Sequence, residues 1–171
     1  MSETTIPLTQ PRVRPATPAD IDTVWSLLQM KAAFDRWLER LEATPESLAS
    51  AMAHPNPLLG VLLAELDGVA VGFTTYYFTF STYLARRCIW IDDLFVDEPA
   101  RRRGVGRALL REMVRLAKRE QCGRIEWVTA AGNDKAIAFY ERIGAQVRTG
   151  TRLCRMDGFA ISTWSKAGES S

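Results

Sequence analysis

A change of hydrophobic period near residue 60 constrains the fold most strongly. The run VLLAEL (61–66) is followed by Asp67-Gly68 and then by VAVGFTTYYF (69–78). These two runs, rich in β-branched and aromatic residues, predict a β-hairpin, because Asp-Gly supplies the positive φ angles that a tight two-residue turn needs. The centre of the chain is therefore expected to be an antiparallel sheet.

A strand and a helix are predicted after this hairpin. CIWIDDLFV (88–96) is nearly continuous in apolar residues, which is typical of a central strand. A helix is predicted over 105–121, and Gly123 is expected to end it. The apolar face of this helix would comprise Val105, Leu109, Leu110, Met113, Val114 and Ala117. RIEWVTA (124–130) predicts a further strand, and 134–143 a further helix.

Two earlier helices begin at threonine–proline pairs. Thr17-Pro18 and Thr44-Pro45 each combine an N-cap residue with proline at the first helical position. Helices are therefore predicted from 18 into the thirties and from 45 until before Pro55. Short strands are expected at 12–17, 145–149 and 152–156. The pattern as a whole predicts a mixed α/β fold.

Composition limits the class of protein. The length of 171 residues fits one domain, expected over 11–164 between flexible tails at 1–10 and 165–171. A net charge of +2 is too mild to indicate nucleic acid or an anionic membrane as a partner. Apolar runs are shorter than the roughly 20 residues of a membrane span, and no secretory signal is recognisable, so a cytoplasmic protein is expected. One histidine (His54) and three cysteines at unrelated spacings predict no metal site.

The stretch DEPARRRGVGRALLR (97–111) places three arginines directly before a predicted helix start. A helix start carries about half a positive charge, which repels cations. A bound anion would reverse this repulsion, and Gly104 and Gly106 would let such an anion approach the backbone N–H groups. On this stretch alone, an anion-binding loop and a solvated basic turn both remain open.

Four segments follow one another in an order that chance rarely produces: LFVDEPARRRGVGRALL, the amphipathic helix, RIEWVTA and GNDKAIAFYERIGA. They resemble the GCN5-related N-acetyltransferase (GNAT) family, which binds acetyl-coenzyme A. RPATPADI, VGFTTYYFTFSTYLARRCIWIDDLFV and RLCRMDG resemble its spermidine/spermine N-acetyltransferase branch. The resemblance implies the GNAT fold, a central mixed, mostly antiparallel twisted sheet of about six to seven strands flanked by about four helices.

The resemblance also implies how acetyl-CoA is held. The backbone of Leu94, Phe95 and Val96 would pair with the pantetheine arm as an added strand does. Asn133 and Ala136 would line the cofactor on the other side. The pyrophosphate would be held by Arg101, Arg102, Arg103, Gly104, Val105, Gly106 and Arg107.

Tyr140 is the residue that the resemblance assigns as general acid. Acetyl transfer expels a thiolate whose parent thiol has a pKa of about 8.5, and a nearby phenol can protonate it. Considered without the family, Tyr140 shares a helix face with Ile137 and Ile143, which is more typical of an aromatic anchor in the core. With Phe139-Tyr140 in the matching motif, catalysis is favoured.

Asp92 and Asp93 are adjacent carboxylates in a nearly apolar strand, where neighbouring side chains point to opposite faces. Each needs a partner, water or a role. The resemblance implies that Asp92 draws in the ammonium substrate and helps to deprotonate it through water. An alkylammonium with a pKa of about 10.4 loses its proton at a cost of roughly 4 kcal/mol at pH 7.4, so Asp92 is expected to bind the amine more than to act as base. For Asp93, substrate binding and a structural pairing both remain open.

Phe34, Asp35 and Trp127 are further candidates for contact with the acceptor, although a solvated helix end or core packing explains them as well. Arg148 and Arg152 depart from the branch, which carries an acidic cluster in that region. They would repel a long polycation and favour a short diamine or an amino acid.

The predicted function is an acetyl-CoA-dependent N-acetyltransferase that acts on a small primary amine by direct attack in a ternary complex, without a metal. The resemblance implies a homodimer. Two alternatives remain: acetylation of protein N-termini or lysines, and a non-catalytic acetyl-CoA-sensing module.

Overall fold

The computed structural model describes residues 10–54 and 57–167. The chain divides after Val128 into two compact units. The single domain expected over 11–164 stays a prediction. The tail expected at 1–10 lies almost wholly outside the described residues, and the described part of the tail expected from 165 belongs to a helix.

The first unit is built on a five-stranded sheet in the order β1-β2-β3-β4-β5. Its first three pairings are antiparallel, and β4 pairs with β5 in parallel. The predicted hairpin joins β2 to β3, with positive φ at Asp67 (53°) and Gly68 (79°). The strands are β1 (Arg12–Pro15), β2 (Gly60–Leu66), β3 (Val69–Ser81), β4 (Arg86–Val96) and β5 (Ile125–Glu126).

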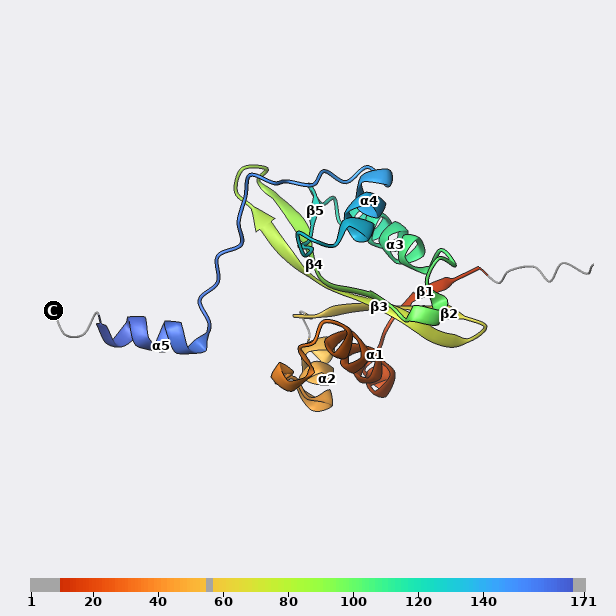
Figure 1. Cartoon of the computed structure of the whole chain (residues 1–171), viewed down its shortest axis with the longest axis horizontal. Coiled ribbons are helices and arrows are strands. Elements are labelled where there is room, and N and C mark those ends of the chain that lie inside the picture. The colour runs from red at the N-terminus through yellow and green to blue at the C-terminus, as the bar shows by residue number, and fades with distance from the viewer. Residues whose placement is uncertain (1–9, 55–56, 168–171) are drawn as a thin grey trace, which may run out of the picture. The chain divides into compact units, whose positions relative to one another are not determined.

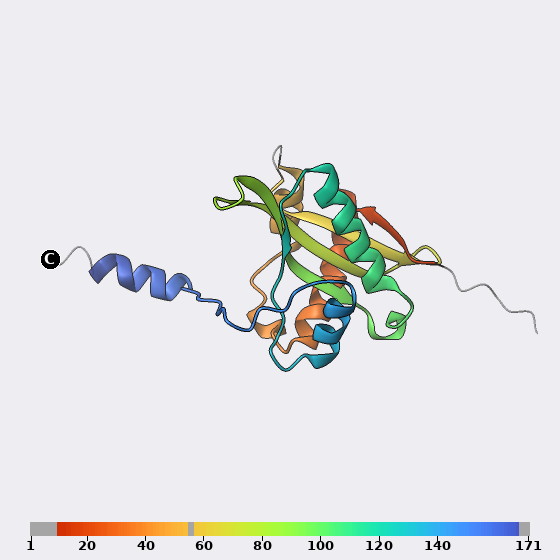
Figure 2. The same ribbon diagram turned by 90° about the horizontal axis from the view of Figure 1, so that it is seen from above.

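Helices cover both faces of this sheet (Figure 1). α1 (Ile21–Phe34) and α2 (Pro45–Ala53) lie on one face, and α3 (Val105–Arg119) lies on the other. Figure 2 shows α3 crossing the strands. Short 3-10 turns occur at η1 (Pro18–Asp20), η2 (Leu38–Arg40) and η3 (Glu98–Ala100). The core between α1 and the sheet comprises Val24, Leu27, Val61, Leu63, Phe73 and Phe95.

Helix α3 differs from the prediction in two details. Val114 was expected on the apolar face but is 59% exposed, because the buried stripe runs through Met113 and Leu116 and leaves Val114 beside it. Gly123 does not end the helix. α3 ends at Arg119, and the left-handed residue after it is Gln121, with a φ of 52°.

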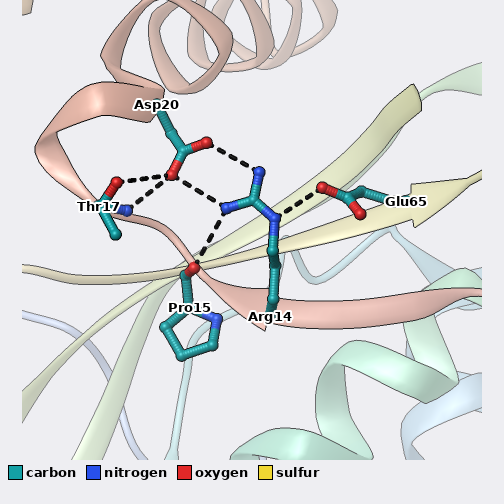
Figure 3. A network of polar contacts seen from close by, with 5 residues as sticks. All are labelled: Arg14, Pro15, Thr17, Asp20 and Glu65. Atoms are coloured by element: carbon teal, nitrogen blue, oxygen red, sulfur yellow. Dashed lines mark hydrogen bonds and ion pairs between the residues drawn. The ribbon is translucent and has the colours of Figure 1, made fainter. Parts of the chain in front are cut away.

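An arginine network fastens the edge strand β1 to the rest of the unit (Figure 3). The Arg14 guanidinium donates to both oxygens of Asp20, at 2.8 and 3.0 Å, and its Nε donates to Glu65 Oε1 at 2.7 Å. Asp20 also accepts from the backbone N–H of Thr17 at 2.8 Å. The hydrogen bonds from Arg14, and then those from Thr17, lower the pKa of Asp20 far below its usual range. Arg14 therefore joins β1, η1 and β2.

The second unit contains α4 (Asp134–Arg142) and α5 (Gly158–Ala167). The strands expected at 145–149 and 152–156 are absent from the described residues there, and β5 is shorter than the strand predicted over 124–130. An extended segment becomes a strand only where a neighbouring strand satisfies its backbone groups. The mixed α/β fold class is thus confirmed, with five strands and five α-helices among the described residues where six to seven strands and about four helices were expected.

Among residues 10–54 and 57–167, none of the helices is both long enough and apolar enough to cross a lipid bilayer.

Candidate active site

A β-bulge lies at the acidic pair of β4. Thr75 of β3 is paired with Asp93, but the next residue, Tyr76, is paired with Ile91. Asp92 is therefore the extra residue of the bulge and has no register partner on β3. Bulges bend the strand that carries them and redirect side chains, so the strict alternation assumed for these two aspartates does not hold here.

Asp93 is held by partners on two elements. Thr75 donates from Oγ1 to Asp93 Oδ2 at 2.9 Å, and the Asp93 backbone N–H donates to the same hydroxyl at 3.0 Å. Lys31 of α1 lies 2.8 Å from Asp93 Oδ1, and only 15% of the Asp93 side chain is exposed. Of the two possibilities left open for Asp93, the structure thus supplies a pairing, with a lysine.

Lys31 bridges two of the predicted acceptor residues. Its ammonium lies 2.7 Å from Asp35 Oδ2, as well as 2.8 Å from Asp93 Oδ1. Burial lowers the pKa of Lys31, but the hydrogen bonds to Asp35 and Asp93 outweigh burial, so the net pKa is raised. Lys31 is therefore cationic throughout the neutral and mildly alkaline range, and it brings α1 and β4 together at this point.

Asp92 is exposed and belongs to the same bulge. Burial, and then the charge of Asp92, raise the pKa of Tyr77 on β3. Tyr77 therefore stays a neutral phenol beside the Asp92 carboxylate. This arrangement leaves Asp92 within reach of solvent and of a solute cation.

The main chain of Leu94–Val96 forms a strand edge. Asp97 N–H donates to Val71 O at 2.9 Å, so by antiparallel alternation Phe95 faces β3, while Leu94 and Val96 direct their N–H and C=O groups away from it. Among the described residues, β5 pairs with β4 only at Ile89 and Trp90. The predicted cofactor-pairing segment therefore presents main-chain groups that no described strand covers.

Arg101 folds back onto this edge. Its Nε donates to Val96 O at 3.0 Å, and its guanidinium carbon lies 4.6 Å from the centre of the Phe34 ring. The Phe34 ring is also 6.3 Å from the ring of Phe95, and Phe34 is 60% exposed. Arg101 thus connects the basic loop with a residue predicted to contact the acceptor.

The loop that enters α3 exposes its backbone. Arg102 and Gly104 have positive φ angles of 62° and 83°. Gly104 is the N-cap of α3, and no side chain of the described residues caps this helix start. The first N–H groups of a helix have no intrahelical partner, so Val105, Gly106 and Arg107 present donors beside exposed arginine side chains. The geometry fits an anion of high charge.

The second unit carries the remaining predicted residues. Asn133 is the N-cap of α4, and its side-chain oxygen accepts from the Ala136 N–H at 3.3 Å. The two residues assigned to the cofactor are therefore joined by a helix cap. Tyr140 is half-buried on α4, and burial raises its pKa. Its ring lies 5.5 Å from that of Phe139.

Within the first unit the structure brings together Phe34, Asp35, Asp93, Phe95 and Arg101. Trp127 follows β5 and is half-buried, so its two interpretations stay open.

Sequence reasoning missed Lys31 and Tyr77. The i,i+4 spacing of Lys31 and Asp35 could have indicated their ion pair, but no sequence signal joins Lys31 to Asp93. Among the described residues, no group of three or more His, Cys, Asp or Glu side chains gathers as a metal site would.

A family model for the acetyltransferase (GNAT) family matches residues 24–145. The chain belongs to the GNAT family. This acetyltransferase is 29% identical to L-ornithine N5-acetyltransferase NATA1 of Arabidopsis thaliana, over 95% of this chain and 94% of that protein. It is 24% identical to thialysine N-epsilon-acetyltransferase of Mus musculus, over 79% of this chain and 84% of that protein. The expected family and branch are confirmed, and the chain is an N-acetyltransferase.

Solved structures show the same fold. An integron cassette protein from the mobile metagenome of V. cholerae matches the acetyltransferase with a TM-score of 0.74 and 22% identity, over 92% of this chain and 98% of that one. An aminoglycoside acetyltransferase from an uncultured soil metagenomic sample matches with a TM-score of 0.73 and 19% identity, over 86% and 97% of the two chains. These matches confirm the GNAT fold.

Proposed function

We propose that this acetyltransferase uses acetyl-CoA to acetylate a primary amine of a small molecule, by direct attack in a ternary complex. The observation that carries the proposal is the order of groups along β4 and the loop after it. The acidic bulge at Asp92 and Asp93 is followed at once by the strand edge at 94–96, and this edge by the basic loop into α3. A site suited to a cation and a site suited to an anion thus adjoin the two ends of one short edge, about 10 Å long at 3.3 Å per residue.

The residues present fit acetyl-CoA. Leu94 and Val96 offer N–H and C=O groups to the amides of a pantetheine arm, as in β-augmentation. The Val96 oxygen accepts from Arg101, but a carbonyl has two lone pairs, so a second bond is compatible with the first. The N–H groups at the start of α3 and the neighbouring arginines would bind the pyrophosphate. Acetyl-CoA supplies a thioester carbonyl for the amine to attack and a sulfur that leaves.

The carboxylates of the bulge account for amine binding. A primary ammonium has a pKa of about 10.4 and is attracted to Asp92, whose carboxylate is exposed. The ammonium must lose one proton before its nitrogen lone pair can attack. Asp92 would orient a water that carries this proton to solvent. In the balanced reaction a C–N bond forms and the C–S bond breaks, the nitrogen loses a second proton as the amide forms, and the leaving sulfur takes up one proton, so that one proton in all is released to solvent.

Tyr140 would assist the departure of the sulfur through its phenolic O–H. Its raised pKa keeps the phenol protonated throughout the neutral range, so the donor form is always present. Full transfer to a thiolate with a conjugate pKa of about 8.5 runs uphill by at least roughly 2 kcal/mol from a phenol of pKa about 10. Tyr140 would therefore act by donating a hydrogen bond as the C–S bond lengthens.

The names of the relatives support a small acceptor. Ornithine and thialysine are both amino acids that carry a primary amine at the end of a side chain, and the relatives that act on them cover most of this chain. Acetylation of protein termini or lysines, and a non-catalytic acetyl-CoA-sensing role, are the rivals that the first experiment must exclude. The homodimer and the cytoplasmic location stay predictions.

The test is thiol release from acetyl-CoA across a panel of ornithine, thialysine, lysine, 1,4-diaminobutane, spermidine and a peptide with a free N-terminus, with Tyr140→Phe assayed in parallel. We expect turnover on the amino acids or the short diamine. Tyr140→Phe should lower kcat by about 10²-fold, the lower end of the usual range for a general acid, while acetyl-CoA raises the melting temperature of both proteins equally. Turnover only on the peptide would refute a small acceptor, and no turnover despite stabilisation by acetyl-CoA would favour the sensing role.

A further inference from the structure

Lys31 places a primary ammonium inside the predicted acceptor region. Its Nζ lies 2.7 Å from Asp35 Oδ2 and 2.8 Å from Asp93 Oδ1, and these carboxylates come from α1 and from β4. The Asp93 side chain is mostly buried, and Asp35 is 40% exposed. Two carboxylates converging on one ammonium are the arrangement expected of a receptor for an alkylammonium group, and here a side chain of the protein itself provides that group.

The carboxylates on Lys31 are held firmly. Asp93 Oδ2 accepts from Thr75 Oγ1 at 2.9 Å, which fixes the carboxylate against β3. The pKa of Lys31 is raised in spite of burial, so the ammonium keeps its charge throughout the pH range of an assay. The cluster of Lys31, Asp35 and Asp93 therefore carries a net charge of about −1 where the two carboxylates alone would carry −2.

A second cation lies on the neighbouring ring. The guanidinium carbon of Arg101 is 4.6 Å from the centre of Phe34, the residue that directly precedes Asp35. Between them, Lys31 and Arg101 balance the charges of Asp35 and Asp93. An acceptor with an ammonium at each end therefore finds the negative charges of Asp35 and Asp93 already balanced. An acceptor that carries a carboxylate beside its second amine is not repelled by net negative charge from this cluster.

We propose that Lys31 is a specificity-determining residue that disfavours diamines and polyamines and favours amino acids with a side-chain amine. The inference rests on the proposed function, because it presupposes acetyl transfer to a small amine. Lys31 acts by neutralising Asp93 and Asp35, so that the site attracts a second ammonium less and repels the acceptor's carboxylate less. It is not assigned a part in bond making or breaking.

Ornithine and 1,4-diaminobutane form a matched pair of probes. They have the same four-carbon spacing between amines, and ornithine differs only by the carboxylate on one end. The measured quantity is kcat/KM for 1,4-diaminobutane divided by kcat/KM for ornithine. A defect that only loosens the fold lowers both constants, so the ratio reports on charge recognition.

Lys31→Met keeps most of the apolar stem and removes the charge. We expect it to raise the ratio at least tenfold. Lys31→Arg keeps the charge and should leave the ratio within about twofold of the wild type, as should Arg36→Met, a control that removes an exposed cation just beyond the same helix. Asp35→Asn makes the cluster more positive and should lower the ratio, which supplies a test in the opposite direction if Lys31→Met is poorly folded.

The outcomes separate the two claims. An unchanged ratio in a folded Lys31→Met protein, or in Asp35→Asn if Lys31→Met is poorly folded, would overturn the role of Lys31 while leaving the acetyltransferase intact. A wild-type enzyme that acetylates neither probe nor any other amine of the panel would refute the proposed function, and the inference with it.

Discussion

Arg14→Met should destabilise the first unit measurably. Arg14 makes a two-pronged contact with Asp20 and a 2.7 Å contact with Glu65, and the exposed fractions of the three side chains are 33%, 18% and 14%. Exposed ion pairs contribute about 0–1 kcal/mol, whereas breaking a buried pair costs about 3–5 kcal/mol. The intermediate exposure places the expected loss at about 2–3 kcal/mol. At roughly 2–4 °C per kcal/mol for a protein of this size, Tm should fall by about 5–10 °C.

The pH dependence provides the sharper test. The pKa of Asp20 is depressed in the folded state, so its contribution to stability is fully present well above the unfolded pKa of about 3.9 and is lost progressively as pH falls from there through the folded-state pKa. Arg14→Met has already lost the largest part of this contribution, which comes from the Arg14 hydrogen bonds, and keeps the part that comes from Thr17. The urea midpoints of wild type and variant should therefore differ most near pH 7 and converge as pH falls from about 4 towards 2.

A matched control lies on the same strand. Arg12 is an exposed residue of β1, and Arg12→Met removes the same charge without touching the network. We expect its free energy of unfolding to stay within about 0.5 kcal/mol of the wild-type value at every pH. A gap between wild type and Arg14→Met that is as wide at pH 2 as at pH 7, or an equal loss in Arg12→Met, would refute this account of the network.

Two further substitutions test single contacts. Gly72→Ala would place a Cβ 2.8 Å from Phe95 O and 3.3 Å from Val105 Cγ1, so it should destabilise the protein by about 1–3 kcal/mol in urea titrations, while Gly132→Ala, which meets nothing within 4 Å, should be neutral. Asn133→Ala removes the α4 cap and should cost about 1 kcal/mol, whereas Asn133→Asp keeps an acceptor and should retain most of the stability. An Asn133→Ala protein of unchanged stability would show that the cap does not hold α4.

Local signals predicted the parts of the fold that depend on local chemistry. Asp67-Gly68 predicted the hairpin because a two-residue turn needs positive φ angles, which these two residues adopt readily. The starts of η1 and α2 were predictable in the same way, because each depends on a threonine and the proline that follows it. The length of β5 was not predictable in this way. A strand exists only as far as its neighbour runs beside it, and of the strand predicted over 124–130 only Ile125–Glu126 pairs with β4.

The candidate site was predictable in its parts but not in its assembly. The loop into α3 was located because arginines at a helix start are anomalous, and the structure gives that loop two positive φ angles and an uncapped helix. The contact of Lys31 with Asp93 joins residues 62 positions apart, and no periodicity encodes such a pair. The bulge at Asp92 was equally hidden, because an inserted residue leaves no compositional mark in an apolar strand.

The bulge at Asp92 shifts the register between β3 and β4 by one residue. Before the bulge, Ile91 is paired with Tyr76, and after it, Asp93 is paired with Thr75. Thr75 and Tyr76 are neighbours on β3 and point to opposite faces of the sheet, so Ile91 and Asp93 also point to opposite faces although they are two residues apart. Because of the one extra residue, Ile91 lies on one face of the sheet, and the Asp93 carboxylate lies on the other face, where it meets Lys31 of α1. Deleting Asp92 would therefore do more than remove a charge. It would make Ile91 and Asp93 direct neighbours opposite Tyr76 and Thr75, so both side chains would keep their faces while the strand would lose the bend that the bulge gives it.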